Sequence, residues 1–138
     1  MVLVAHAKHP VHRVKGPLDR AALAAFVEVQ VADSGLREAP PPTRLASIGS
    51  PHLFELSDFA SKREAIREGL GFGWLPLHLV DGDLASGELV TVPFVEGDRY
   101  TLQPLVAHRQ GRPLGPAARA LFDDLVAAAS APAKKRKK

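Results

Sequence analysis

Short apolar runs alternate along this chain with stretches whose apolar residues recur at helical spacing, and the two patterns predict strands separated by helices. The segments predicted to form strands are Val2–Ala5, Val27–Val31, Phe54–Leu56, Phe72–Leu75, Glu88–Val92 and Tyr100–His108. The segments predicted to form helices are Pro17–Phe26, the stretch after Ser57, Leu77–Ala85 and a final stretch that opens at Gly115-Pro116. Strands that alternate with helices at this rhythm favour a parallel-type sheet with flanking helices, so the predicted fold class is α/β.

The central helix has two possible starting points. Ser57 and Asp58 offer oxygen acceptors for the open N–H groups at a helix start. Ser61 and Glu64 have the spacing of a capping box, which would place the start a few residues later. Gly69 is a natural left-handed stop for this helix. Three apolar residues near helical spacing are predicted to face a core: Phe59, Ile66 and Leu70.

The N-terminal half combines a helix pattern, a strand pattern and an irregular segment. Asp19 falls in the first turn of the predicted helix, where a carboxylate interacts favourably with the helix dipole. Three valines then alternate with Glu28 and Gln30, which predicts a strand with one apolar face. Three consecutive prolines within Leu36–Pro51 predict a surface loop there, with a short element around Leu45–Ile48.

Length and composition indicate one domain without disulfides. The chain has 138 residues, and its 46% hydrophobic content is ample for a core. It has no cysteine, which excludes disulfide bonds and thiolate metal sites. No apolar run is long enough to cross a membrane, and the first residues are too polar for a signal peptide. We therefore expect a cytoplasmic location and no membrane partner.

The net charge of +3 comes from the end of the chain. The last five residues are all basic: Lys134, Lys135, Arg136, Lys137 and Lys138. Without them, 13 Lys and Arg stand against 15 Asp and Glu, so the rest of the chain carries about −2. No nucleic-acid surface is predicted on the globular part. Residues 131–138 are predicted to form a disordered basic tail that makes nonspecific nucleic-acid contacts at most.

Three segments, taken in order, carry a more specific pattern. AIREGLGFGWLPLHLVDGDLASGELV, from Ala65 to Val90, combines a helix ending in G-L-G, an apolar strand ending in L-P and an L-x-S-G-x-L-V segment. LVAHAKHPVH at Leu3–His12 precedes it, and LQPLVAHRQGRPLGPAARALFDDL at Leu102–Leu125 follows it. This ordered set resembles the effector-binding domain of LysR-type transcriptional regulators.

The resemblance implies an organisation in three parts. Residues 1–108 would form subdomain II, one lobe of a type-2 periplasmic-binding-like domain. Residues 109–130 would form the C-terminal helix, which belongs to subdomain I in the family, and residues 131–138 would follow as the tail. Family members begin with a winged helix-turn-helix, which binds DNA, and continue into the first part of subdomain I. Neither is present in this sequence, so a truncated regulator or a fragment is expected.

The resemblance also implies a non-enzymatic function. In the family, a small-molecule effector, often an organic anion or amino acid, binds between two lobes, and lobe movement changes how an oligomer sits on DNA. We expect this chain to be the ligand-sensing portion of such a regulator and to bind effector weakly or not at all by itself. The alternative is a stand-alone interaction module that associates with itself or with a full-length regulator and binds no ligand.

Candidate binding residues follow from sheet topology and from the resemblance. Open α/β sheets bind ligands at the carboxyl ends of their strands, where helix N-termini offer free N–H groups. Ser57 and Asp58 occupy such a junction, and Asp33 and Ser34 follow another strand. An ordinary helix cap explains Ser57 and Asp58 equally well. The resemblance adds three residues near its effector contacts: His6, Phe72 and Trp74.

Three other kinds of site are not favoured. His6, His9 and His12 repeat every third residue, but a strand would send alternate residues to opposite faces and Pro10 interrupts a helix. The glycines at 69, 71 and 73 follow a helix and precede a strand, the reverse of a dinucleotide-binding loop. No G-x-S-x-G elbow or comparable catalytic constellation is present. We therefore expect no metal, no cofactor and no enzymatic activity.

Overall fold

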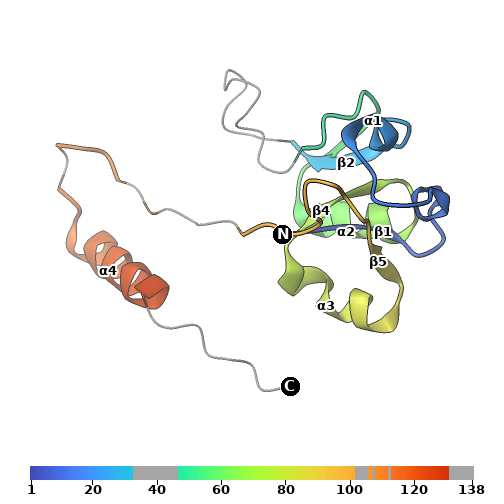
Figure 1. The fold of residues 1–138 in the computed structure, drawn as a ribbon. Coiled ribbons are helices and arrows are strands. Elements are labelled where there is room, and N and C mark those ends of the chain that lie inside the picture. Colours follow the sequence, from blue (N-terminus) through green and yellow to red (C-terminus); the bar gives the residue numbers. More distant parts are fainter. Residues whose placement is uncertain (33–46, 102–105, 107, 112, 131–138) are drawn as a thin grey trace. The chain divides into compact units, whose positions relative to one another are not determined.

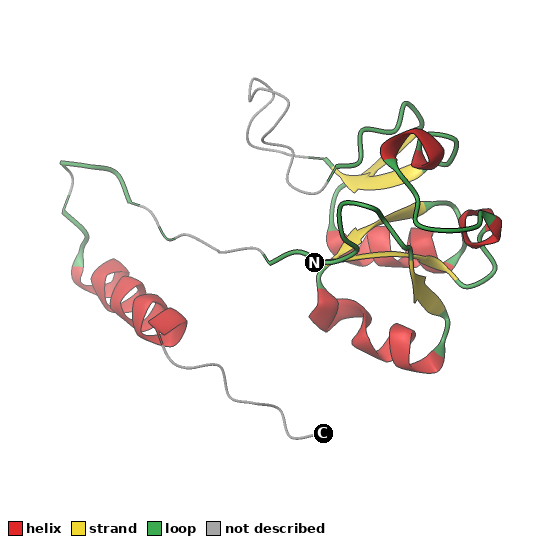
Figure 2. Cartoon of the chain, viewed as in Figure 1, coloured by secondary structure: helices red, strands yellow, loops and turns green. Residues whose placement is uncertain are grey.

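The computed structural model describes residues 1–32, 47–101, 106, 108–111 and 113–130. The chain divides into two compact units, Met1–Thr101 and Leu102–Lys138, and each is described by itself. The first unit contains β1 (Val2–His6), the 3-10 helix η1 (Pro10–Arg13), α1 (Arg20–Leu23), β2 (Glu28–Val31), β3 (Leu53–Leu56), α2 (Phe59–Arg67), β4 (Phe72–Leu75), α3 (Leu77–Ser86) and β5 (Leu89–Thr91). The second contains α4 (Pro116–Ser130) (Figures 1 and 2).

A mixed five-stranded sheet organises the first unit. The strand order is β3-β2-β4-β1-β5. β2 is parallel to β3 and β4, whereas β1 is antiparallel to its neighbours β4 and β5. The predicted α/β class, with a parallel-type mixed sheet and flanking helices, is therefore confirmed.

Helices cover both faces of this sheet. α2 and α3 pack on one face, and α1 and η1 lie over the other (Figure 1). The residues buried on the α2 and α3 face are Val2, Val4, Val29, Ala65, Ile66, Leu75, Val80 and Leu89. Those buried on the opposite face are Leu3, Ala5, Val11, Leu18, Leu23, Ile48, Phe72, Trp74, Val92 and Phe94. Alternate residues of β1 and β4 thus serve two separate cores, as the period of a strand requires.

The polar residues of β2 are buried as well as its valines. Glu28 has no exposed surface, and Gln30 is almost fully buried. The Glu28 carboxylate accepts hydrogen bonds from the backbone N–H groups of Ile48, Gly49 and Ser50 at 2.7, 3.1 and 3.1 Å. The alternating pattern of β2 predicted one apolar face correctly. Its other face is covered by residues 48–50, which the Glu28 carboxylate binds.

Most predicted helix ends are confirmed. Asp58 is the N-cap of α2, which decides against the later start at the Ser61 capping box. Gly69 and Gly87 have left-handed φ angles of 74° and 77° after α2 and α3. Pro116 is the first residue of α4, where the missing proline N–H costs nothing.

The helix predicted over Pro17–Phe26 is wrong in extent, because only Arg20–Leu23 is helical. The Leu18 N–H donates to the Pro93 carbonyl at 2.7 Å, and Leu18 forms a bridge with Phe94. This pairing holds the segment before the helix in an extended conformation. Asp19 is the N-cap, with its carboxylate accepting the Ala22 N–H at 2.7 Å, rather than a first-turn residue.

The predicted core face of α2 is wrong for two of its three residues. Ile66 is fully buried, but Phe59 and Leu70 are 39% and 53% exposed. Leu70 lies beyond the end of α2 and the left-handed turn at Gly69, so helical spacing no longer applies to it. Phe59 is the first residue of the helix. The buried stripe of α2 consists of Lys62, Ala65 and Ile66.

Gly71, which directly precedes β4, and Gly73 within β4 allow the close packing of β2 and β4. A Cβ on Gly71 would lie 2.4 Å from the Val27 carbonyl oxygen, and one on Gly73 would lie 2.6 Å from the Val29 carbonyl oxygen. Neither distance is possible for a real side chain.

Several predictions fall outside the described residues. They concern most of the loop Leu36–Pro51 with its element around Leu45–Ile48, and the basic tail 131–138. The described residues of Tyr100–His108 form no strand. In the second unit, Leu121 and Leu125 of α4 are 60% and 44% exposed, and the Phe122 ring makes an edge contact with His108.

Candidate functional site

The carboxyl ends of β2, β3 and β4 form one edge of the sheet, because these three strands are parallel. From β2 the chain continues to β3 on one side and then crosses to β4 on the other side. The strand order therefore reverses between β2 and β4. In open α/β sheets, ligands bind at the carboxyl edge beside such a reversal. This carboxyl edge is the candidate functional site.

Ser57 and Asp58 lie at the carboxyl edge, directly after β3. One Asp58 carboxylate oxygen accepts the Ser61 N–H at 2.9 Å, and the other accepts the hydroxyls of Ser61 and Ser57 at 2.9 and 3.0 Å. The backbone hydrogen bond from Ser61, reinforced by these hydroxyls, lowers the pKa of Asp58 below its usual value. Asp58 therefore caps α2 and keeps a negative charge at the carboxyl edge.

Tyr100 reaches the same edge beside the start of β1. β1 is antiparallel to β4, so Val2 pairs with Leu75 at the carboxyl end of β4. The Tyr100 N–H donates to the Met1 carbonyl at 3.1 Å, and its ring makes an edge contact with Trp74 at 4.8 Å between centroids. The Tyr100 hydroxyl is buried without a hydrogen-bond partner in the described part of the chain. Burial raises the pKa of Tyr100, so the hydroxyl stays protonated and can donate to a ligand.

Lys62 lies one helical turn after Asp58 and is 4% exposed. Its side chain occupies the space that the absent Gly73 side chain leaves open, with Cε and Nζ 3.0 and 3.3 Å from where a Cβ would be. Burial lowers the pKa of Lys62 to about 8, while the charge of Glu28 acts in the opposite direction. The sequence contained a signal for this residue, because Lys62 stands at i+3 from Phe59 and i−4 from Ile66, within the apolar stripe.

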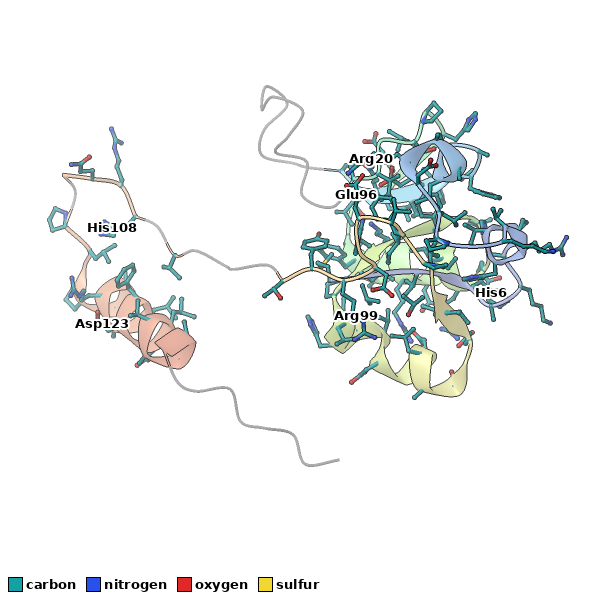
Figure 3. The ribbon with its side chains drawn as sticks, in the orientation of Figure 1. His6, Arg20, Glu96, Arg99, His108 and Asp123 are labelled. Carbon is teal, nitrogen blue, oxygen red and sulfur yellow. The ribbon has the colours of Figure 1, made fainter. Side chains whose placement is uncertain are left out.

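Among the described residues of the predicted site, Ser57 and Asp58 lie together at the carboxyl edge. His6 pairs with Leu89 at the end of β1, on the opposite edge of the sheet, and Figure 3 shows it beside η1. Phe72 has no exposed surface and Trp74 is 5% exposed, so both belong to the core. Asp33 and Ser34 lie outside the described residues.

The histidines near β1 serve the local backbone. The Nδ1 atoms of His6 and His9 accept the N–H groups of Lys8 and Val11 at 3.1 and 3.2 Å. Within the described part of the chain, no three His, Cys, Asp or Glu residues are grouped so that they could hold a metal ion.

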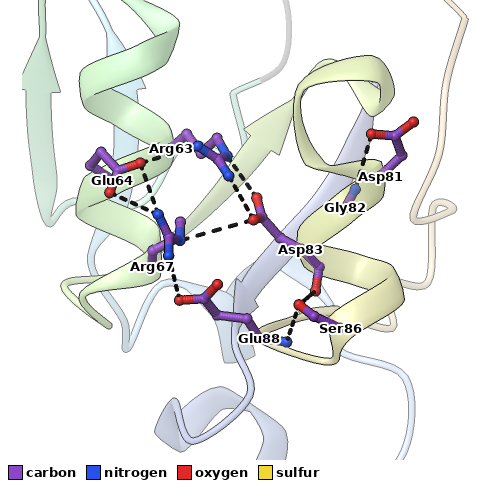
Figure 4. A network of polar contacts seen from close by, with 8 residues as sticks. All are labelled: Arg63, Glu64, Arg67, Asp81, Gly82, Asp83, Ser86 and Glu88. Atoms are coloured by element: carbon purple, nitrogen blue, oxygen red, sulfur yellow. Dashed lines mark hydrogen bonds and ion pairs between the residues drawn. The ribbon is translucent and has the colours of Figure 1, made fainter.

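A network of charged side chains holds α2 against α3 (Figure 4). The Arg63 guanidinium donates to both oxygens of the nearly buried Asp83 carboxylate at 2.6 and 2.7 Å. Arg67 donates to Glu88 at 2.8 Å and to Glu64 at 3.1 Å. An open groove of about 620 Å³ lies beside this network, lined by Ala60, Ser61, Arg63, Glu64 and Leu79. The network therefore fixes the helix that carries Asp58 and Lys62.

Comparison with known proteins decides the family. Residues 1–130 match the family described as LysR substrate binding domain. The chain belongs to this family. The LysR substrate-binding domains are regulatory domains rather than enzymes, and the curated relatives are described as transcriptional regulators.

Two such relatives are the probable HTH-type transcriptional regulator YhaJ of Escherichia coli strain K12 and the HTH-type transcriptional regulator YhaJ of Escherichia coli O157:H7. Each is 34% identical to this LysR substrate-binding domain over 91 residues, which is 66% of this chain and 30% of the relative. The chain thus spans less than a third of the length of these regulators.

Among solved structures, the regulatory domain of AphB from Vibrio vulnificus, treated with cumene hydroperoxide, is similar with a TM-score of 0.49 and 15% identity. That similarity covers 91% of this chain and 63% of the AphB chain. Within the described residues of this LysR substrate-binding domain, no helix is both long and apolar enough to span a membrane.

Proposed function

We propose that this domain senses a small-molecule effector for a transcriptional regulator, and that the effector contacts the carboxyl edge of β2, β3 and β4. The family match over residues 1–130 carries the proposal. The topology supports the location, because the strand order reverses between β2 and β4 at this edge. Membership of a substrate-binding family supports sensing rather than a ligand-free interaction module.

The groups at the carboxyl edge favour particular ligands. The buried Tyr100 hydroxyl lacks a partner among the described residues and can donate to a ligand oxygen. The Asp58 carboxylate would repel a ligand that is purely anionic, and it would attract an ammonium group. Small amino acids and organic acids that also carry a donor group therefore fit this edge best.

We also propose that the whole regulator acts in the cytoplasm as an oligomer and meets DNA through a winged helix-turn-helix domain of the kind found in the family. The DNA-binding and oligomeric functions belong to the whole regulator. Light scattering across a range of concentrations tests self-association of this chain, and a constant monomer mass would count against that part of the proposal.

The location of the site is tested by titrating the 15N-labelled chain with small amino acids and carboxylates. Because the described edge offers contacts from a single sheet, we expect affinities on the order of millimolar. Backbone resonances of Ser57 to Ser61 should shift, and Ser57→Ala should weaken binding roughly 3- to 10-fold, as expected for one lost hydrogen bond.

His6→Ala is the matched control, because His6 lies on the opposite edge of the sheet. The proposal predicts no change in affinity for this variant. If His6→Ala abolished binding while Ser57→Ala retained it, the effector would bind at the other edge. If no probe in a broad panel shifted any resonance, sensing by this chain would be refuted.

A further inference from the structure

Lys62 is a buried cation without an ion-pair partner among the described residues. It is 4% exposed and lies in the buried stripe of α2 with Ala65 and Ile66. In the described part of the chain, no carboxylate lies within 4.0 Å of its ammonium group, and that group donates no hydrogen bond. Asp58 stands at i−4, a spacing that favours an ion pair on a helix, yet the two residues do not pair. Asp58 is instead engaged with Ser57 and Ser61.

The Lys62 ammonium group lies over the junction of β2 and β4, where the strand order reverses. Its Nζ is 3.3 Å from the position that a Gly73 Cβ would occupy, and the Val29 carbonyl oxygen is 2.6 Å from the same point. Gly73 belongs to β4 and Val29 to β2, so the amine covers the junction of these two strands. Helical side chains lean toward the helix N-terminus, which for α2 is the carboxyl edge. The Lys62 N–H donates to the Asp58 carbonyl at 3.1 Å, which confirms that the residue is one turn from that edge.

Nothing in the packing of α2 requires a charge at this position. An apolar side chain of similar length would fill the space over Gly73 without the cost of removing an ammonium group from water. The charge of Glu28 attracts Lys62, but Glu28 serves the other face of the sheet and already accepts three backbone N–H groups. The cation is therefore available to an anion that enters from the carboxyl edge.

We propose that Lys62 provides the counter-charge for a carboxylate group of the effector, between β2 and β4 at the carboxyl edge. This inference rests on the proposed function and specifies its ligand class. The carboxylate would be held by Lys62, while the Tyr100 hydroxyl and Asp58 would contact other parts of the ligand. A neutral ligand of the same shape, such as the corresponding amide, would leave the Lys62 charge unpaired and bind more weakly.

The test uses the full chain labelled with 13Cε-lysine, whose resonances report the ionisation of each amine. Alanine and lactate are the probes, because each carries a carboxylate together with a donor group, and alaninamide and lactamide are their counterparts without the carboxylate. Loss of one resonance in Lys62→Met assigns the Lys62 signal. We expect saturating alanine or lactate to raise the pKa of Lys62 by about one unit, which corresponds to about tenfold preference for the charged amine. The amides should leave it unchanged.

Lys62→Met should abolish the carboxylate-induced shifts of the Ser57 to Ser61 backbone. Lys8→Met, an exposed lysine after the opposite end of β1, is the matched control and should retain them. If a probe binds wild type and Lys62→Met equally, sensing stands and the role of Lys62 is overturned. If neither carboxylates nor amides alter any resonance of the wild type, the proposed function and this inference are both overturned.

Discussion

At the scale of single residues, two buried charged side chains differ in whether hydrogen bonds from the protein replace their lost hydration. Glu28 is fully buried, but three backbone N–H groups from residues 48–50 replace the water it loses. Lys62 is 4% exposed, and the described residues supply its ammonium group with no such replacement. The carboxylate therefore contributes to holding a loop, whereas the ammonium group lowers the stability of the fold.

Lys62→Met should stabilise the domain at pH 7 by about 3 kcal/mol, from the difference between the ordinary pKa of 10.5 and the native value of about 8. Below pH 8 the Lys62 amine is protonated in both the native and the unfolded chain, so wild type bears the full cost of burying the charge. Between pH 8 and 10.5 the native amine loses its proton while the unfolded one keeps it, so wild type gains stability relative to the variant. Urea unfolding at pH 7 and pH 10 measures both differences. Equal stability of the two proteins at pH 7 would contradict the burial argument.

Acid should destabilise the segment after β1 through His9. Burial, with smaller contributions from the charges of His12 and His6, lowers the pKa of His9 below 6.5. Protonation would also remove the Nδ1 acceptor that caps η1 through the Val11 N–H. Because the unfolded chain binds this proton more readily, stability present above pH 6.5 is lost as the pH falls through that value.

His9→Asn separates the two effects, since asparagine caps a helix without titrating. Its urea midpoint should fall less than that of wild type between pH 7.5 and pH 5.5. His9→Ala should show the same weaker pH dependence and a lower midpoint at pH 7.5, because it also loses the cap. Identical pH profiles for wild type and His9→Asn would exclude His9 as a source of the acid sensitivity.

At the scale of elements, the junction of β2 and β4 depends on the absence of side chains. Gly71→Ala would place a Cβ 2.4 Å from the Val27 carbonyl oxygen, a backbone atom that cannot rotate away. We expect a loss of about 2–3 kcal/mol or more, from forced separation of the two strands. Thermal unfolding followed by circular dichroism measures it.

Gly82→Ala is the control within the same unit. Gly82 lies inside α3, and a Cβ there would meet nothing within 4 Å. The higher helix propensity of alanine should stabilise this variant by about 1 kcal/mol. Two glycine-to-alanine changes should therefore alter stability in opposite directions, and a similar loss in both would show that the contact at Val27 is not responsible.

The elements that could be predicted from sequence are those with local causes. Asp58, Gly69 and Pro116 fix helix ends through their own side chains and backbone angles, so no distant contact can overrule them. The length of α1 could not be predicted, because the pairing of Leu18 with Phe94 decides where that helix begins. The burial of Phe72 and Trp74 and the distance between His6 and Ser57 also depend on strand order, which no local pattern contains.

The candidate site was predictable in part for the same reason. Ser57 and Asp58 were identified because a strand followed by a capping sequence marks a junction in any α/β fold. Lys62 interrupts an apolar stripe, which was visible in the sequence, but its meaning depends on the space over Gly73. Tyr100 gave no local signal, because its hydroxyl is buried through contacts with Met1 and Trp74 at distant positions.

At the scale of the whole molecule, charge divides the chain into a mildly acidic body and a basic terminus. The last five residues carry five positive charges, and the remainder carries about −2. Any attraction to polyanions should therefore disappear when Lys134–Lys138 are removed. We expect the full chain to be retained on heparin at 20 mM salt and released below about 300 mM, because a few charges give a steep salt dependence. The shortened chain should not be retained, and equal retention would place a cationic surface on the body.

The position of β1 in the sheet has a consequence for how the chain folds during synthesis. β1 precedes its partners by a long stretch of chain: Leu3 pairs with Trp74 and His6 pairs with Leu89. As the chain leaves the ribosome, this apolar strand has no neighbour until β4 and β5 have followed it. The sheet must therefore form by long-range closure, which is slower than the formation of local contacts. A pause in translation before β4 would lengthen the time during which Val2–His6 is exposed to aggregation.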